Sequence, residues 1–176
     1  MAEKLAWDEI VQELQAPIYR YCMHLLRSSA DAEDATQDSF LKAYRAENQP
    51  PNLPEMRLWL FTIARNVCLD RLRWWKRSPL SFLNSDSTPT SGGFEQPGHQ
   101  SDLKFILQRV LAELPKRQYE VFVLRHWHGF STEETATLLG IDSGSVKSHL
   151  KRSIDRLRRE LSALGISDND FASASV

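Results

Sequence analysis

The stretch Ser131-Thr-Glu-Glu-Thr-Ala-Thr-Leu-Leu-Gly140-Ile-Asp-Ser-Gly-Ser-Val146 determines how the C-terminal part of this chain folds. Ser131 and Glu134 have the spacing of a capping box, in which each side chain accepts a hydrogen bond from the backbone N–H of the other residue. Gly140 stands where a short helix would end in a left-handed residue, and Ile141 supplies the apolar contact beyond it. The stretch therefore predicts a short helix followed by a tight turn.

A second helix is predicted directly after this turn. Its apolar residues recur at helical spacing, and they are Val146, Leu150, Ile154, Leu157 and Leu161. We expect Ser143 or Ser145 to cap its first turn. A helix, a tight turn with glycine and a second helix together form a helix-turn-helix motif.

The second helix of this motif carries polar side chains on the face opposite its apolar stripe. Those nearest its N-terminus are Lys147, Ser148, Lys151 and Arg152. This end of a recognition helix is the part that reaches base edges in the major groove of DNA. The bases further along, Arg156, Arg158 and Arg159, are placed to contact phosphates or a protein neighbour. On geometry alone, an ordinary surface helix of a small bundle is the competing interpretation.

The total charge of the chain conceals a strong asymmetry. The 176 residues include 22 Lys+Arg and 23 Asp+Glu, so the two signs nearly cancel. Residues 1–40 nevertheless contain eight acids and three bases, a local net charge of −5, whereas residues 65–77 and 143–160 each have a net charge of +4. Two separate basic stretches suit a polyanion that is contacted at two places, although solvated helix faces also carry such charge.

The domain organisation follows from one stretch of unusual composition. Residues 79–100 are rich in Ser, Pro, Thr and Gly and show no periodicity, so we interpret them as a flexible linker. It separates two predicted domains, residues 1–78 and 101–164, and a frayed tail follows at 165–176. Both domains show helical periodicity, and Asn-Gly or Asp-Gly hairpin signals are missing. We therefore predict an all-α fold of two small helical domains.

The first domain is expected to contain three helices. The first is marked by apolar residues at positions i, i+3, i+4 and i+7, which are Ile18, Tyr21, Cys22 and Leu25. We expect Ser29 or Asp31 to cap the second helix. Three prolines, Pro50, Pro51 and Pro54, are expected to break the chain before the third.

The third helix changes along its length from apolar to basic. We expect Trp59 and Phe61 to lie in the core, whereas at least one of the adjacent Trp74 and Trp75 should be exposed. The bases of this helix are Arg65, Arg71, Arg73, Lys76 and Arg77. Aromatic faces interleaved with bases hold unstacked single strands of nucleic acid, and the amide of Asn66 can hydrogen-bond a base edge.

A duplex-binding motif and a strand-holding helix, joined by a linker, suit a protein that opens promoters. Over about residues 10–163 the chain resembles the extracytoplasmic-function (ECF) sigma factors, the small two-domain sigma subunits of bacterial RNA polymerase. Four stretches carry the resemblance in the family's order. Residues 31–45 resemble region 2.2, and residues 58–66 with Asp70 and Arg73 resemble regions 2.3 and 2.4. Residues 114–125 resemble region 4.1, and residues 129–140 with 145–152 resemble region 4.2.

The resemblance implies a role for each candidate residue. The residues implied to bind the clamp helices of the polymerase β′ subunit are Gln37, Asp38 and Phe40, and region 4 is implied to meet the β flap. Asn66 is implied to capture a flipped base of the minus-10 element, and the strand's path is implied to be lined by Arg65, Arg71, Arg73 and Trp74. The minus-35 element is implied to contact Lys147, Ser148, Lys151 and Arg152. A cognate anti-sigma factor is expected by the same resemblance.

Other function classes have less support from the sequence. Cys22 and His24, like His126 and His128, are two residues apart and so face different directions on a helix, which does not suit a metal site. No phosphate-binding loop or nucleophile motif is present, so we expect neither a cofactor nor catalysis. A free-standing helix-turn-helix regulator is the serious alternative, and a pure protein-interaction module is a third class.

The sequence also bears on where the protein works. No apolar run approaches the roughly 20 residues of a membrane span, and the N-terminus lacks a secretory signal pattern. Two cysteines do not make a disulfide framework for a chain of this length. We therefore expect a cytoplasmic protein that is not inserted into a membrane.

Overall fold

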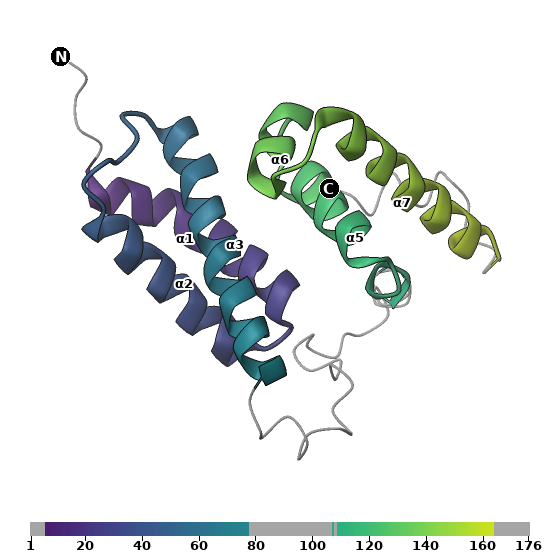
Figure 1. Cartoon of the computed structure of the whole chain (residues 1–176), viewed down its shortest axis with the longest axis horizontal. Helices are drawn as coiled ribbons and strands as arrows, with labels where there is room; N and C mark the ends of the chain where they lie inside the picture. The colour runs from purple at the N-terminus through teal and green to yellow at the C-terminus, as the bar shows by residue number, and fades with distance from the viewer. Residues whose placement is uncertain (1–5, 78–106, 108, 164–176) are drawn as a thin grey trace. The chain divides into compact units, whose positions relative to one another are not determined.

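The computed structural model describes residues 6–77, 107 and 109–163 (Figure 1). The chain divides into two compact units, Met1–Phe94 and Glu95–Val176, and each is described by itself. Both units are helical and the described residues contain no strand, which confirms the predicted all-α class. The predicted linker at 79–100 and the predicted tail at 165–176 lie outside the described residues, so the predicted domain boundaries stay predictions.

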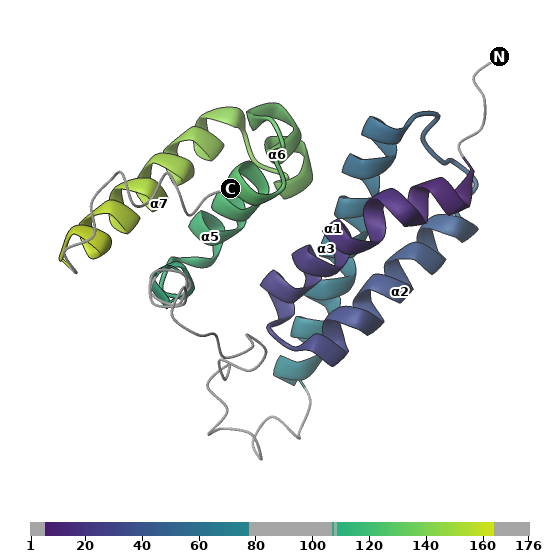
Figure 2. The same ribbon diagram turned by 180° about the vertical axis from the view of Figure 1, so that it is seen from behind.

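The N-terminal unit contains three long helices that all contact one another. They are α1 (Trp7–Leu26), α2 (Ser29–Arg45) and α3 (Leu53–Arg77), and Figures 1 and 2 show them side by side from opposite directions. Tyr21 of α1 and Phe61 of α3 are fully buried, and their ring centroids lie 5.1 Å apart. Burying such large apolar side chains between the helices holds the unit together.

Local hydrogen bonds set where these helices begin. The backbone N–H of Asp31 donates to the side chain of Ser28 at 3.4 Å, so Ser28 caps α2 and the expectation of Ser29 or Asp31 was wrong. Ser28 has extended backbone and therefore stands just outside the helix, where a cap belongs. Asn52 caps α3 by accepting from the N–H of Glu55 at 3.0 Å.

The third proline does not precede α3 as expected but lies inside its first turn. Pro54 follows Leu53, the first residue of the helix. This position is tolerated because the first N–H groups of a helix have no partner within it. The prediction that all three prolines break the chain was therefore wrong for Pro54.

The C-terminal unit contains the helix-turn-helix motif. Its elements are α5 (Lys116–Phe122), the π-helix η2 (Val123–Trp127), α6 (Thr132–Leu139) and α7 (Ser143–Ala163). The core cluster consists of Leu107, Val110, Leu111, Leu114, Phe122, Leu157 and Leu161. The sequence did not predict the π-helical turn that continues α5.

The predicted capping box and glycine turn are both confirmed. The N–H of Ser131 donates to Glu134 Oε2 at 2.7 Å, and the N–H of Glu134 donates to Ser131 Oγ at 3.1 Å. Gly140 has φ of +65°, a left-handed conformation that an L side chain disfavours. The N–H of Ile141 then donates back to the carbonyl of Ala136 at 3.1 Å, as in a Schellman motif.

The cap of α7 differs from the one expected. Asp142 Oδ1 accepts from the N–H of Ser145 at 2.8 Å, and Asp142 Oδ2 accepts from the Ser145 hydroxyl at 2.6 Å. Ser145 is therefore a donor to the cap, and the expectation that Ser143 or Ser145 caps this helix was wrong. The hydrogen bonds from Ser145 hold the pKa of the Asp142 carboxyl below its ordinary value.

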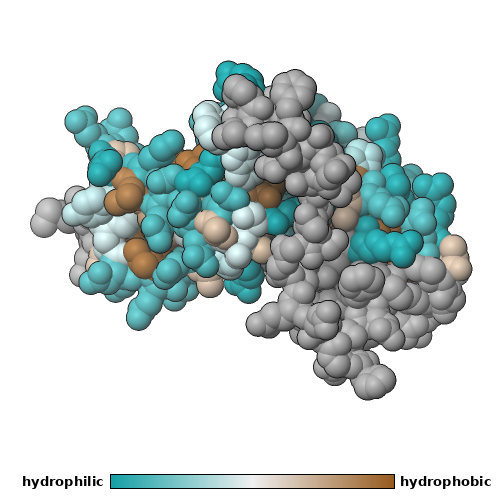
Figure 3. Space-filling model, turned by 90° about the horizontal axis from the view of Figure 1, so that it is seen from below, coloured by the Kyte–Doolittle hydropathy of each residue, from teal (hydrophilic) through white to brown (hydrophobic). Residues whose placement is uncertain are grey.

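The apolar stripe of α7 faces the core as predicted. Val146, Leu157 and Leu161 are buried, and Leu150 and Ile154 are half-buried. The opposite face is left to solvent. The coloured part of the surface in Figure 3 is mostly hydrophilic with scattered apolar spots. None of the described helices is both long and apolar enough to cross a membrane.

Candidate nucleic-acid interfaces

The first turns of α7 present a compact polar face. All four residues predicted to contact a duplex are exposed, namely Lys147, Ser148, Lys151 and Arg152. They occupy positions i, i+1, i+4 and i+5, so they share one side of the helix. Val146, next in the chain to Lys147, is fully buried and anchors this turn from behind. The turn is therefore held rigidly while its donors point outward.

The C-terminal bases of α7 are used differently. Arg156 Nη2 lies 3.9 Å from Glu113 Oε2 within the same unit, and its side chain is only 32% exposed. Arg158 and Arg159 are exposed. Arg156 thus meets a neighbour from its own fold, whereas the other two lie on the surface.

The second half of α3 carries an exposed polar stripe. Asn66, Asp70 and Arg73 follow one another at i, i+4 and i+7 and are all exposed. Arg73 Nη1 lies 3.1 Å from Asp70 Oδ1, with both side chains about two-thirds exposed. A surface pair of this kind is weak and can open for a phosphate. Arg65 is half-buried, and the side chain of Lys76 lies outside the described part of the chain.

The aromatic residues of α3 confirm the prediction for Phe61 and for the adjacent tryptophans, whereas the expectation that Trp59 lies in the core was wrong. Phe61 is fully buried and Trp59 is half-buried. Of the adjacent tryptophans, Trp74 is 60% exposed and Trp75 is half-buried. Trp74 therefore offers a flat apolar face to solvent one residue beyond Arg73, where an unstacked base could lie on it.

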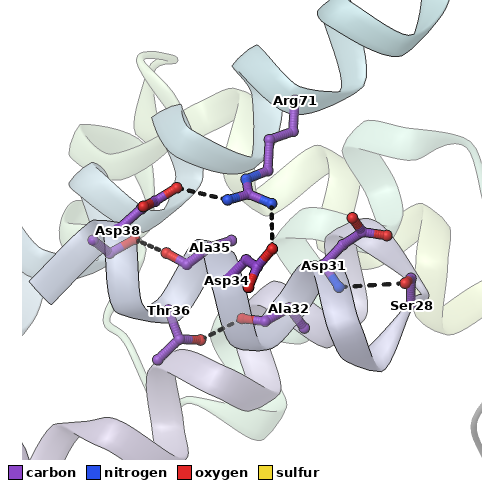
Figure 4. A network of polar contacts seen from close by, with 9 residues as sticks. Ser28, Asp31, Ala32, Asp34, Ala35, Thr36, Asp38 and Arg71 are labelled. Atoms are coloured by element: carbon purple, nitrogen blue, oxygen red, sulfur yellow. Dashed lines mark hydrogen bonds and ion pairs between the residues drawn. The ribbon is translucent and has the colours of Figure 1, made fainter.

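Arg71 is half-buried like Arg65, and it forms ion pairs with the neighbouring helix. Arg71 Nη2 lies 2.6 Å from Asp38 Oδ2, and Nη1 lies 3.7 Å from Asp34 Oδ2 (Figure 4). These residues belong to α3 and α2, and 33 positions separate Arg71 from Asp38. The structure therefore brings together a residue predicted to contact DNA and one predicted to contact the polymerase.

The outer face of α2 combines polar and apolar side chains. Gln37 is exposed, and Asp38 and Phe40 are half-buried. On the inner side, the hydroxyls of Thr36 and Ser39 donate to the carbonyls of Ala32 and Ala35 at 2.6 and 2.5 Å. These hydroxyls satisfy their own helix, so they are buried at little cost.

Sequence reasoning did not identify two apolar residues on this face. Leu41 is 49% exposed and Tyr44 is 62% exposed, and they lie at i+4 and i+7 from Gln37. Trp7 of α1 meets Tyr44 edge to face, with ring centroids 5.2 Å apart. The spacing from Gln37 was the available signal, because it places both residues on the stripe of α2 that Gln37 begins.

The cysteines and histidines lie apart from these faces. The thiols of Cys22 and Cys68 contact each other inside the N-terminal unit and are fully buried, and both are free. The side-chain hydrogen bond with Cys22, together with burial, raises the pKa of the Cys68 thiol. Burial, with Arg20 and Arg27 nearby, lowers the pKa of His24 to about 4.

His126 and His128 of the other unit face different directions, as predicted. His128 is buried, whereas His126 is exposed and lies 4.7 Å, centroid to centroid, from the ring of Phe122. Within the described residues, no group of three or more His, Cys, Asp or Glu side chains is arranged to hold a metal ion.

Two family models match the chain, one on each unit. The model of Sigma-70 region 2 matches residues 10–77, which include most of α1 and all of α2 and α3. The model of Sigma-70, region 4 matches residues 104–157, which include α5, α6 and most of α7. Both candidate interfaces therefore fall within recognised sequence regions.

Similar proteins agree with these matches along almost the whole chain. The RNA polymerase sigma-E factor of Streptomyces coelicolor is 33% identical over 163 residues, covering 93% of this chain and 90% of the relative. The ECF RNA polymerase sigma factor SigM of Mycobacterium tuberculosis is 32% identical over 167 residues, covering 95% and 83%. The sigma factor RpoE of Bartonella quintana, solved with the anti-sigma factor NepR, matches with a TM-score of 0.69 at 25% identity, covering 88% of this chain and 96% of that one.

Proposed function

This chain belongs to the ECF sigma factors of bacterial RNA polymerase, and from that premise we propose which faces it uses to bind core polymerase and promoter DNA. A sigma factor directs promoter-specific initiation, and the chemistry of RNA synthesis resides in the polymerase. Its place of work is the cytoplasm, where the polymerase meets the chromosome. The chain is a specificity subunit and needs no cofactor of its own for this role.

The minus-35 element is contacted by the first turns of α7. Lys147, Ser148, Lys151 and Arg152 are exposed on one side of the helix, at the end that enters a major groove. Lys147 donates as a point charge to guanine or phosphate oxygens, whereas Arg152 can bridge two acceptors. The capping box and Gly140 turn hold the supporting helix in place.

The minus-10 element is held by the basic half of α3. Asn66 hydrogen-bonds a flipped base, Trp74 offers a surface for stacking, and Arg73 neutralises the backbone. Arg65 and Arg71 complete the predicted set. The exposure of Asn66, Arg73 and Trp74 on the described surface supports this assignment.

Core polymerase is bound through the outer face of α2. Gln37, Asp38 and Phe40 contact the clamp helices of β′, and the exposed Leu41 and Tyr44 extend this surface with apolar area. An acidic and partly apolar face suits a basic helical partner. Region 4 meets the β flap.

A protein inhibitor that covers these faces completes the proposal. The similar RpoE structure contains that sigma factor with the anti-sigma factor NepR. This chain also requires an inhibitor, because a sigma factor with exposed polymerase-binding residues competes for core enzyme whenever it is present. We therefore assign it an anti-sigma partner of its own.

The observation that carries the proposal is the presence of two exposed basic faces of different composition in one chain, the first turns of α7 and the aromatic second half of α3. The experiment is transcription with the purified chain and bacterial core polymerase on a library of promoter sequences. We expect transcripts that depend on the chain and share two conserved elements. Duplex binding by the chain alone, without any dependent transcript, would instead establish a free-standing helix-turn-helix regulator.

A further inference from the structure

One ion pair joins the two proposed binding sites of the N-terminal unit. Arg71 belongs to the minus-10 set on α3, and Asp38 belongs to the polymerase-binding set on α2. Their side chains meet at 2.6 Å, and Asp34 approaches the same guanidinium at 3.7 Å (Figure 4). Neither binding event can therefore use its full set of side chains while this pair remains closed.

The three side chains differ in how far they are open to solvent. The side chain of Arg71 is 25% exposed, whereas those of Asp38 and Asp34 are 49% and 66% exposed. A partner can reach the carboxylates while the pair is closed. It can reach the guanidinium fully only after the pair opens. This asymmetry sets an order, in which the acids are engaged first and the arginine second.

The charges of these three side chains also favour binding of the protein partner before the DNA strand. Two carboxylates around one guanidinium leave a local excess of negative charge, which repels a DNA phosphate and attracts a basic protein surface. Partly exposed ion pairs of this kind are weak, so a basic helix that offers its own donors can replace Arg71 at Asp38. The replaced guanidinium then becomes available to a phosphate.

We infer that Asp38, assisted by Asp34, is a gate that withholds Arg71 from single-stranded DNA until a basic surface of the polymerase takes its carboxylate. The inference rests on the proposed function of the two faces. With this gate, polymerase binding raises the affinity for the strand and strand binding raises the affinity for polymerase, since a coupling between two sites acts equally in both directions. Arg73 has no such gate, because its partner Asp70 lies on its own helix.

The test measures the affinity of the full chain, without polymerase, for fluorescent single-stranded oligonucleotides of random sequence at low salt. Asp38→Asn should raise this affinity by about twofold to fivefold, and Asp34→Asn should raise it less. In an Arg71→Gln background the gain from Asp38→Asn should vanish. Asp70→Asn is the matched control, and its gain should persist in both backgrounds because it acts through Arg73. Arg71→Met, which keeps the aliphatic packing, replaces Arg71→Gln if that variant unfolds.

Two outcomes in the free chain would overturn the gate. One is a gain from Asp38→Asn that is equal in both backgrounds, which would reduce the effect to removal of one negative charge. The other is no gain at all. Either result leaves the proposed function standing.

Transcription with core polymerase separates the gate from the proposed function. Arg71→Gln should lower promoter-dependent transcription, because Arg71 is released in the holoenzyme. A loss with Asn66→Ala but none with Arg71→Gln contradicts the gate and the placing of Arg71 in the minus-10 set, and it leaves the rest of the proposed function standing. No loss with either Asn66→Ala or Lys147→Ala contradicts the proposed function itself.

Discussion

The two helices proposed to face DNA carry their positive charge in different ways. Within the described residues, Lys147, Lys151 and Arg152 of α7 face solvent without an acidic partner, whereas Arg71 and Arg73 of α3 are each bound to aspartate. A duplex attracts α7 directly, with the salt dependence expected of phosphate contacts. On α3, the inferred gate makes Arg71 available to a strand only after its ion pair with Asp38 opens, whereas the exposed pair of Arg73 and Asp70 is weak. The difference suits a protein that must locate a duplex before it holds a single strand.

The largest expected effect tests whether α7 depends on its unit's core. Leu157 is a residue of α7, is 1% exposed and belongs to the core cluster of the C-terminal unit. Leu157→Ala should destabilise the C-terminal unit by about 2–5 kcal/mol, because it removes buried surface and leaves a cavity. Hydrogen exchange should show faster exchange in α5 to α7 and little change in α1 to α3. Equal acceleration in both units would show that they do not unfold separately.

A second change tests the exposed basic residues in the first turns of α7. Lys147→Ala should weaken binding to the minus-35 duplex by about 1–3 kcal/mol and relax the preference at the contacted base. Binding of the chain to duplexes with each base substituted in turn measures both effects. Ser162→Ala, at an exposed position near the far end of α7, serves as the control. Undiminished selectivity at every base would contradict the assignment.

The N-terminal unit should also respond to acid through His24. Its pKa of about 4 lies below the ordinary value of 6.5, so the unfolded chain binds the proton more readily. The contribution of neutral His24 to the free energy of unfolding is fully present above pH 6.5 and is lost as the pH falls toward 4. The loss amounts to about 2 kcal/mol at pH 5. Denaturant unfolding followed by hydrogen exchange in α1 measures this slope. His24→Gln should flatten it, and an unchanged slope would assign the acid sensitivity to other groups.

The smallest expected effect concerns the strand-binding face. Asn66→Ala should weaken capture of the minus-10 strand by about 1 kcal/mol, roughly fivefold, because one side-chain hydrogen bond is lost. The loss should appear in the formation of the open complex and not in the preceding closed complex. Rates of promoter opening, followed by a fluorescent base in the minus-10 element, separate the two steps. Equal loss in both would contradict a role in strand capture.

Local features of the fold could be predicted from the sequence because their causes lie within a few residues. The capping box of Ser131 and Glu134 and the left-handed Gly140 depend on neighbours in the chain, and the structure contains both. Caps were harder to predict where several candidates compete. Asp142 takes the place expected of Ser143 or Ser145, since its carboxylate accepts two hydrogen bonds at once.

Features of the candidate site that depend on packing could not be predicted in the same way. The pair of Arg71 and Asp38 spans 33 positions and forms only when α2 lies against α3. The contact between the thiols of Cys22 and Cys68 likewise depends on how α1 meets α3. Exposure of at least one of Trp74 and Trp75 followed from their being adjacent in a helix, whereas the ion pair of Arg71 required the neighbouring helix.

The burial of both thiols has a practical consequence for biophysical work. Cys22 and Cys68 are fully enclosed, so maleimide dyes added to the folded chain have no native cysteine at its surface to react with. Cysteines introduced at the exposed positions Glu47 and Glu133, one in each unit, would then take up a donor and an acceptor fluorophore selectively. The native sequence can thus serve as its own background for following the distance between the two units by energy transfer as polymerase, inhibitor and DNA are added.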